Sequence, residues 1–254
     1  MTPAVHVVTL ASADRADRVR LQRTALTHWA PAIAHTTAAI GQTLFELPES
    51  TVLDATGPGR LQLARARNLA GDHAADAGTE IIVFLDADCL PGPRLIDRYT
   101  AALADHPDAV ACGPVTYLRA DQPATAETLD ALTRYRNPHP GRPAPADGAV
   151  RPAADDEYQL FWSLSFALTA RLWRDCREAF GGFSVDYRGY GGEDTDFGMQ
   201  LRAHRIPMLW TGGADAFHQW HPPSHTAAGN REAIRANAAL FHSRWGYWPM
   251  QDWL

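Results

Sequence analysis

Asp86 and Asp88 follow directly after the apolar run Ile81–Leu85, and Pro91 and Pro93 come soon after them. A short apolar run bounded by turn residues predicts a strand buried on both faces, and the strand is expected to end at Pro91 because proline cannot continue its ladder. Ligands of an open α/β sheet bind at the carboxyl ends of its strands, and residues two apart on a strand point the same way. Both carboxylates are therefore expected to face one ligand, and hard oxygen ligands suit a divalent cation that bridges to phosphates. An Asp-rich turn without a ligand is the alternative for this triplet taken alone.

A second group of acids occurs in the glycine-rich stretch Gly189–Asp196, which also contains Tyr190. Glycine lets the backbone approach a ligand closely, and a helix predicted over 194–205 places the acids near its N-terminus. The helix dipole stabilises carboxylates there and is expected to keep the pKa of Asp194 low. An acidic helix start without a ligand is the alternative, but the glycines and the aromatic residue are more than a cap requires.

His218 and His221 lie three residues apart, and His225 is close to them in the sequence. Imidazole nitrogens at this spacing are suitable metal ligands when a carboxylate site is nearby. A lone histidine is more often structural, so it is the aspartate pair in the same chain that favours a metal for at least one of His218 and His221. Two glycines before them give the segment Gly212–His225 the hinge freedom of a lid over metal and nucleotide.

Two further predicted elements carry basic and polar residues toward the same edge of the sheet. A turn after the predicted strand Val5–Leu10 contains Arg15, which is either a solvated charge at a helix start or a contact to a nucleotide or pyrophosphate. The helix predicted over Leu61–Ala77 carries Arg67 and Asn68 near its start.

Periodicity and turn residues predict alternating strands and helices. The remaining predicted segments are strands at Thr43–Leu47, Ala109–Tyr117, Phe161–Thr169 and Met208–Trp210, and helices at Ala16–Trp29, Ile96–Asp105, Ala170–Phe180 and Asn230–Trp245. Right-handed crossovers place the helices on both faces of the sheet, so the expected fold is α/β with a mostly parallel central sheet. Asn137–Pro152 is rich in proline, glycine and alanine, and it is expected to be a mobile loop that is either disordered or functional.

Composition excludes several classes of function. The chain has 254 residues and a hydrophobic content of 46%, which allows a sizeable core, and its net charge of -6 does not favour nucleic-acid binding. All 23 basic residues are arginine, so a mechanism that needs lysine is excluded. The three cysteines fit neither a disulfide framework nor a zinc site. The chain enters a strand without a signal peptide, and no apolar run is long enough to span a membrane, so a soluble cytoplasmic protein is expected.

The motifs together resemble a known family. ARNLA at 66–70 followed by IIVFLDADCLP at 81–91 resembles the large glycosyltransferase family 2. GGFSVDYRGYGGEDTDF at 181–197 resembles the C-terminal region of β-1,4-galactosyltransferases and their bacterial relatives. From Val5 to about Pro223, the chain is thus similar to nucleotide-sugar-dependent glycosyltransferases that have a D-x-D motif and a single Rossmann-like domain of the glycosyltransferase A type.

The resemblance implies roles for the residues of the donor site. Asp88 would coordinate a divalent metal, Mn²⁺ or Mg²⁺, and Asp86 would help to hold the ribose or the waters of the metal. His218 or His221 would complete the coordination. The residues implied to line the nucleotide are Thr9, Arg15, Arg67 and Asn68.

The resemblance also implies an acceptor site. Asp194 would be the catalytic base, with Glu193 beside it. Tyr190 stands where the galactosyltransferases have a tryptophan that contacts sugar, and Gly191 and Gly192 follow it at the acceptor. The single domain would then comprise a nucleotide-binding half at 1–118, a mobile loop region at 119–158 that includes a flap on the acceptor side, and an acceptor and metal-loop half at 159–254.

The implied reaction is inverting transfer of a sugar from a nucleoside-diphosphate sugar to an acceptor hydroxyl. A base removes the proton from the hydroxyl, and a divalent metal neutralises the leaving diphosphate as a Lewis acid, with arginine as the available cationic side chain. The alternatives are a retaining transferase on the same fold, in which Asp194 is not required as base, and a non-catalytic carbohydrate-binding protein. A sugar-phosphate nucleotidyltransferase is disfavoured because the chain lacks both lysine and a glycine-rich N-terminal loop. The sequence names neither the sugar nor the acceptor nor the oligomeric state.

Overall fold

A computed structural model of the chain describes residues 3–48, 50–222 and 228–250. The strands are β1 (Val5–Ser12), β2 (Ala34–Ile40), β3 (Thr51–Asp54), β4 (Ile81–Leu85), β5 (Cys89–Pro91), β6 (Val110–Cys112), β7 (Val115–Tyr117), β8 (Val150–Pro152), β9 (Ser165–Thr169), β10 (Met208–Thr211) and β11 (Ala216–His218). The α-helices are α1 (Ala16–Trp29), α2 (Leu63–Asp76), α3 (Leu95–Asp105), α4 (Ala170–Phe180), α5 (Glu193–Ala203) and α6 (Ala228–Trp245). The 3₁₀ helices are η1 (Ala13–Arg15), η2 (Ala126–Tyr135) and η3 (Asp155–Leu160).

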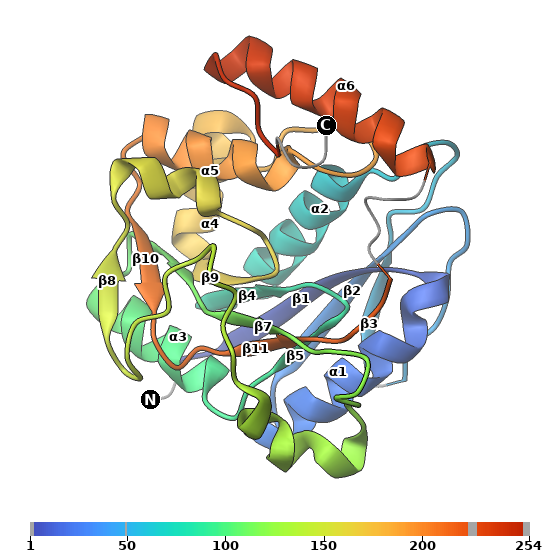
Figure 1. The fold of residues 1–254 in the computed structure, drawn as a ribbon, viewed down its shortest axis with the longest axis vertical. Helices are drawn as coiled ribbons and strands as arrows, with labels where there is room; N and C mark the ends of the chain where they lie inside the picture. The colour runs from blue at the N-terminus through green and yellow to red at the C-terminus, as the bar shows by residue number, and fades with distance from the viewer. Residues whose placement is uncertain (1–2, 49, 223–227, 251–254) are drawn as a thin grey trace.

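The strands form two sheets. The large sheet has the order β3-β2-β1-β4-β9-β6-β10-β8, and the small sheet has the order β5-β11-β7. In the large sheet only β9 and β8 run antiparallel to their neighbours, and the other pairs are parallel. Figure 1 shows α2, α4 and α5 on one side of this sheet and α1 and α3 on the other. The predicted α/β fold with a mostly parallel sheet and helices on both faces is therefore confirmed.

The central strand β4 is buried on both faces, as its apolar run predicts. Ile82 and Phe84 pack into the core beneath α2 and α4, where the Phe84 ring stacks on Phe166 with 4.6 Å between centroids. The alternate residues of β4 pack into a second core beneath α3. Burial of each such side chain contributes roughly 1.5–3 kcal/mol, so β4 fixes the middle of the domain and the position of the chain that follows it.

The predicted helix Ala170–Phe180 forms as α4 with the same bounds. The Thr169 hydroxyl accepts a hydrogen bond from the backbone N–H of Leu172 at 3.1 Å, which caps the first turn. Gly181 ends the helix in the left-handed conformation at φ +84°, where a side chain would be strained.

The strand predicted at Thr43–Leu47 is wrong. The second and third strands are β2 and β3, which flank that segment and pair with each other in parallel. β2 consists mostly of alanine and threonine. It is buried because it lies between β3 and β1 in the sheet, and small side chains suffice where helices cover the strand. Leu44 is instead 53% exposed, whereas Leu47 is buried without belonging to a strand, so apolar character alone was a misleading signal.

The strand predicted at Ala109–Tyr117 is divided into β6 and β7, which belong to different sheets. Gly113 and Pro114 separate them, and a Cβ on Gly113 would lie 2.0 Å from the Ala214 carbonyl oxygen. The backbone at Gly113 therefore lies so close to the backbone at Ala214 that only glycine fits there. Proline after it removes a ladder donor, so the chain leaves one sheet and enters the other.

Part of the predicted mobile loop takes part in the fold. Val150–Pro152 forms β8 and pairs with β10. Gly148 N–H donates to the Gly212 carbonyl at 3.0 Å, and Gly212 N–H donates to the Ala149 carbonyl at 2.8 Å. The mobility of this region stays a prediction. Within the described ranges, none of the helices combines the length and the apolar character needed to cross a membrane.

Candidate active site

Asp86 and Asp88 lie in a turn between β4 and β5, at the carboxyl end of the central strand. The strand predicted to reach Pro91 ends at Leu85, and Cys89 N–H donates to the Asp86 carbonyl at 2.8 Å to close the turn. The two acids consequently do not lie on one continuous strand, and they contact different partners. Asp86 contacts Arg67, whereas Asp88 contacts Arg15 and two histidines. The predicted extent of the strand is therefore wrong, and the prediction that both acids face one ligand stays a prediction.

Asp88, His218 and His221 form a cluster whose ligand atoms all lie within 4.8 Å of one another. Pairing of β11 with β5 places His218 opposite Cys89, and Gln219 N–H donates to the Asp88 carbonyl at 2.7 Å. The Nε2 atoms of His218 and His221 lie 3.4 and 3.1 Å from the Asp88 carboxylate. The predicted metal ligands thus come together because a strand pair holds them in register.

The electrostatics of this cluster favour a cation. Burial alone would raise the pKa of Asp88, but the hydrogen bond with His221 and the charges of His218 and Arg15 outweigh it and lower the pKa to about 2. Burial lowers the pKa of His218. An ionised carboxylate and neutral imidazoles are the forms that bind divalent metals.

The hydrogen bonds of His221 fit a metal ligand. Its Nδ1 lies 2.7 Å from the Pro222 carbonyl oxygen, so Nδ1 carries the proton and donates it. Its Nε2 lies 3.1 Å from the Asp88 carboxylate, on the side where a shared ion would sit. The Arg15 guanidinium occupies the same place: its Nη1 lies 2.5 Å from Asp88 Oδ2 and 3.4 Å from His221 Nε2. The donor set fits a divalent metal ion, with Asp88, His218 and His221 as the residues that would hold it.

A second cluster contains Asp86, Glu193 and Asp194 around the guanidinium of Arg67. Arg67 lies on α2 and is 5% exposed. It donates from Nη1 to Glu193 Oε1 at 2.7 Å, and its Nη2 lies 3.5 Å from Asp86 Oδ1. The other carboxylate oxygen of Glu193 is buried and has no hydrogen-bond partner among the described residues. One cation, Arg67, therefore lies among three acids, so the cluster is negative when all three are ionised.

Burial dominates the titration of these acids. It raises the pKa of Asp86 to about 7, against the opposing charge of Arg67. It also raises the pKa of Asp194 to about 6, helped by the charge of Glu193 and opposed by Arg67 and by backbone hydrogen bonds from Thr195 and Ser163. The expectation that the helix dipole keeps the pKa of Asp194 low is wrong, because desolvation of a buried carboxylate outweighs the helix N-terminus.

Glycines shape the backbone that presents Asp194. Gly191 and Gly192 both have φ +91°, and Gly192 is the residue that precedes α5. Two successive left-handed residues turn the chain so that Tyr190 and the acids lie together. Burial raises the pKa of Tyr190, and the charges of Asp194 and Glu193 raise it further, which shows that the phenol lies in their field.

Thr9 and Asn68 use their polar atoms to hold the fold. The Thr9 hydroxyl donates to Gln22 Oε1 at 2.7 Å and to the Leu85 carbonyl at 3.0 Å. The Asn68 amide exchanges hydrogen bonds with the backbone of Phe183 at 2.8 and 2.9 Å. Both residues therefore hold neighbouring segments of the fold in place through these hydrogen bonds. His225 and the rest of 223–227 lie outside the described residues, so the predicted lid is described only as far as Pro222.

Gln22 is a site residue that sequence reasoning missed. It lies on α1, fully buried, and its amide donates to the Asp86 carbonyl at 2.7 Å and to the Cys89 carbonyl at 2.8 Å. It thereby fixes both ends of the aspartate turn. Its spacing from Val19 and Leu26 places a polar residue on the apolar face of the helix, and that was the available signal.

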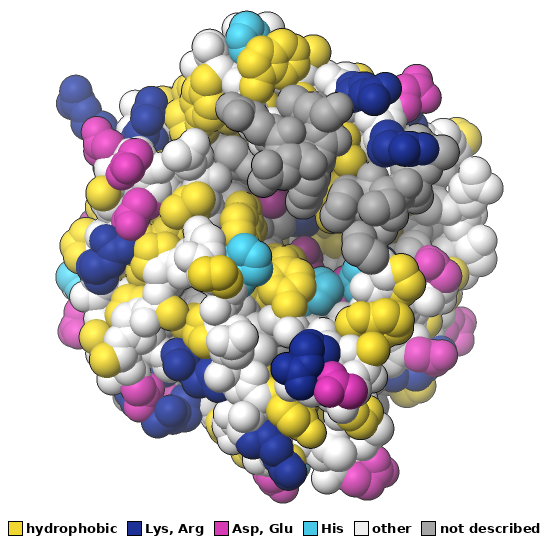
Figure 2. Space-filling model, viewed as in Figure 1, with side chains coloured by type: hydrophobic (Ala, Val, Ile, Leu, Met, Phe, Trp, Pro, Cys, Tyr) yellow, Lys and Arg dark blue, Asp and Glu magenta, His cyan; other side chains and the backbone are white. Residues whose placement is uncertain are grey.

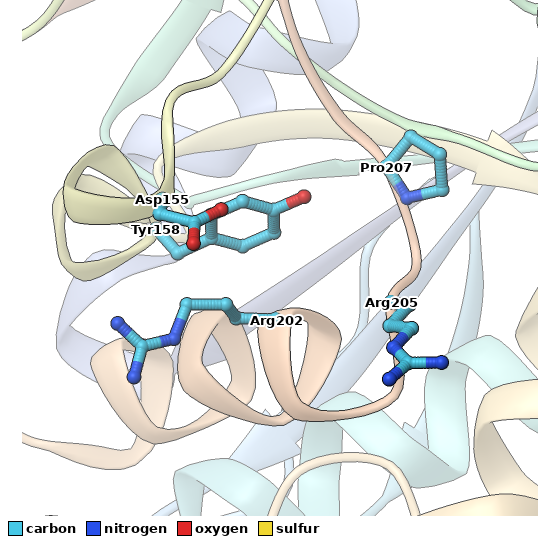
Figure 3. Close-up of a pocket in the computed structure, with 5 residues that line it drawn as sticks. All are labelled: Asp155, Tyr158, Arg202, Arg205 and Pro207. Carbon is cyan, nitrogen blue, oxygen red and sulfur yellow. The ribbon is translucent and has the colours of Figure 1, made fainter.

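Figure 2 shows histidine and hydrophobic side chains side by side near the middle of one face, next to a hollow in which acidic side chains are visible. A different hollow of about 620 Å³ lies at the C-terminal end of α5 (Figure 3). Its lining residues are Asp155, Tyr158, Arg202, Arg205 and Pro207. Because α5 begins at Glu193, this second hollow is at the opposite end of the helix from the acidic cluster.

No protein-family model matches the chain. Validoxylamine A glucosyltransferases from Streptomyces hygroscopicus subsp. jinggangensis (strain 5008) and subsp. limoneus are each 29% identical over 212 residues, which cover 71% of this chain and 44% and 41% of the relatives. The chain thus spans less than half the length of the curated relatives it matches.

Two solved structures share the fold. Residues 1–349 of S. aureus TarS in complex with UDP-GlcNAc align with a TM-score of 0.58 and 10% identity over 92% of this chain and 65% of that one. GalNAc-T7 with UDP, GalNAc and Mn²⁺ aligns with a TM-score of 0.62 and 10% identity over 95% of this chain and 50% of that one. The fold is of the glycosyltransferase A type.

Proposed function

We propose that this chain transfers a sugar from a nucleoside-diphosphate sugar to an acceptor hydroxyl, with inversion at the anomeric carbon. The observation that carries the proposal is the meeting of a candidate metal-ligand cluster and a cluster of carboxylates at the carboxyl end of β4. Relatives named as glucosyltransferases and structural neighbours with UDP or a UDP-sugar bound support this reading of the site.

The donor half of the reaction is assigned to residues 1–118 together with the two histidines. Asp88, His218 and His221 hold the divalent metal, which supplies Lewis-acid neutralisation of the leaving diphosphate when it is bound. Arg15 contacts Asp88 from the turn after β1, so its guanidinium is placed to bind a phosphate oxygen beside the metal ligands. Asp86 contacts Arg67 in the acidic cluster. This places Asp86 at the end of the proposed site that receives the sugar of the donor.

The acceptor half is assigned to residues 159–254, with 119–158 as a flap. Asp194 removes the proton from the acceptor hydroxyl as its oxygen attacks the anomeric carbon. A base with a pKa of about 6 is ionised at neutral pH and stronger than an ordinary aspartate, which suits this role. Glu193 stands beside Asp194 and accepts a hydrogen bond from Arg67, so it positions the guanidinium at the base and raises the pKa of Asp194.

The test is a nucleoside-diphosphate release assay with a panel of nucleotide sugars, Mn²⁺, and monosaccharide and cyclitol acceptors. The chain should turn over at least one donor, and NMR should show a product of opposite anomeric configuration to the donor. Asp194→Asn keeps the shape of the side chain and should lower turnover roughly 10²–10⁴-fold while the diphosphate still binds. Asp105→Asn makes the same change at an exposed acid at the C-terminal end of α3 and should leave turnover unchanged.

Full turnover in Asp194→Asn, or a product that keeps the configuration of the donor, would show a retaining transferase instead. Sugar binding without any release of nucleoside diphosphate would show a non-catalytic carbohydrate-binding protein.

A further inference from the structure

An aromatic row starts at the metal-ligand cluster. The ring of Tyr117, at the end of β7, stacks on His218 with 4.5 Å between centroids and an angle of 26°. His139 lies 5.5 Å from Tyr117, and Trp162 lies 5.2 Å from His139. Tyr117 is 44% exposed, so one side of its ring covers the metal ligand and much of the rest meets solvent. We call Tyr117, His139 and Trp162 the aromatic row.

The backbone holds the aromatic row in place. β7 pairs with β11 in a register that sets Tyr117 opposite His218. The His139 N–H donates to the Val115 carbonyl at 2.9 Å, which ties the loop to β7. Beneath Trp162, the buried guanidinium of Arg142 lies 5.6 Å from the indole. These contacts fix three rings that come from separate segments, so the row is a prearranged surface.

The far end of the aromatic row reaches the catalytic base. Trp162 is followed by Ser163, whose backbone hydrogen bond to the Asp194 carboxylate helps to hold its pKa down. At the near end, Tyr117 stacks on His218, one of the proposed metal ligands. The row therefore extends from the proposed metal ligands to the proposed base.

His139 offers a hydrogen-bond donor in the middle of the row. Its Nδ1 accepts the Gly141 N–H at 3.1 Å, so in the neutral ring the proton is on Nε2. Burial lowers the pKa of His139, helped by the charge of Arg142, which keeps the ring neutral at neutral pH. The Nε2–H can thus donate to a hydroxyl oxygen that lies on the row.

We propose that the aromatic row is the acceptor subsite and that it binds a cyclic polyol, a sugar or cyclitol ring. Such a ring has an apolar C–H face and a rim of hydroxyls. In ligand sites, aromatic side chains bury the apolar C–H face of such a ring, and a few polar groups bind its hydroxyls. The C–H face lies on the exposed ring of Tyr117, one hydroxyl accepts from His139, and another points toward Asp194 on the side of Trp162. This assignment rests on the proposed function.

The test is saturation-transfer difference NMR with the full chain, Mn²⁺ and UDP. Methyl β-glucoside and myo-inositol are the ring probes, and mannitol is an open-chain polyol with the same kind of hydroxyls. In the wild type, the C–H protons of a ring probe should receive saturation from the protein. Tyr117→Ala removes the aromatic face and should weaken ring-probe affinity about tenfold, whereas Tyr117→Phe keeps that face and should retain the affinity. Mannitol should give little saturation. Calorimetry should show unchanged affinity for UDP with Mn²⁺ in both variants.

Three results would overturn the assignment. Equal saturation of a ring probe in the wild type and Tyr117→Ala would remove the row from the subsite, and absence of any ring-probe signal in the wild type would exclude this class of ligand. A fall in UDP affinity in Tyr117→Ala would show that Tyr117 serves the nucleotide or merely supports His218. If the donor is turned over but no ring probe binds, only the assignment of the row as acceptor subsite is rejected. If a ring probe binds but no donor is turned over, only the proposed transferase activity is rejected.

Discussion

The charges around Asp194 can be changed in opposite directions by two single substitutions. Glu193 is a like charge that raises the pKa of Asp194, and Arg67 is an opposite charge that lowers it. Glu193→Gln removes the first charge while its amide oxygen can still accept the hydrogen bond from Arg67, so the pKa of Asp194 should fall. Arg67→Met removes the second and should raise the pKa.

The size of the effect follows from the position of Asp194. Its pKa of about 6 lies well above the ordinary 3.8, a difference worth about 3 kcal/mol between its two protonation states. A neighbouring charge within hydrogen-bond reach typically moves a carboxylate by about one unit or more. A base acts when it is ionised, so activity is lost as the pH falls through its pKa. The acidic limb of kcat/KM should therefore move down by about one pH unit in Glu193→Gln and up by about one in Arg67→Met.

The assay is the pH profile of nucleoside-diphosphate release between mildly acidic and neutral pH. Glu232→Gln makes the same chemical change at a 78% exposed residue that pairs with Arg60, and it should leave the limb in place. Arg67→Met breaks a buried ion pair, which costs about 3–5 kcal/mol of stability, so its profile must be measured well below its unfolding temperature. A limb that stays in place in Glu193→Gln, or that moves the same way in both variants, would refute the assignment of Asp194 as the titrating base.

Two further predictions concern arginines. In Arg15→Ala the metal no longer competes with a guanidinium for Asp88, so the affinity for Mn²⁺ without nucleotide should rise about tenfold. Diphosphate binding should become weaker in the same variant. Unchanged or weaker Mn²⁺ binding in electron paramagnetic resonance titrations would contradict this prediction. Arg205 ends α5 at φ +57°, where Ile206 N–H donates to the Leu201 carbonyl at 2.9 Å in the pattern usually completed by glycine. Arg205→Gly should therefore stabilise the fold by about 0.5–1 kcal/mol in urea unfolding, and a loss of stability would mean that the arginine side chain contributes to the fold.

The sequence predicted the parts of the fold that depend on local pattern. The apolar run of β4 and the capped helix α4 form as expected, because their burial and capping are written in consecutive residues. β2 was missed because its small residues are buried by neighbours that are distant in sequence. Tertiary context decides such strands, and one sequence does not contain it.

The site was predicted in part for the same reason. The types and order of Asp88, His218 and His221 indicated a metal cluster, and the structure brings these residues together. The turn that contains Asp86 and Asp88 is held by Gln22 from another helix, and the raised pKa of Asp194 depends on desolvation by segments distant in sequence. Neither can be derived from spacing along the chain.

The central claim is that Asp88 binds a metal that the nucleotide requires. Calorimetric titration of UDP into the protein with Mn²⁺, and again with a chelator, tests it directly in the wild type and in Asp88→Ala. Metal-dependent binding in the wild type that is lost with the chelator and in Asp88→Ala is the predicted result, with circular dichroism showing that the variant is folded. Equal UDP affinity with and without metal, or in both proteins, would contradict the account.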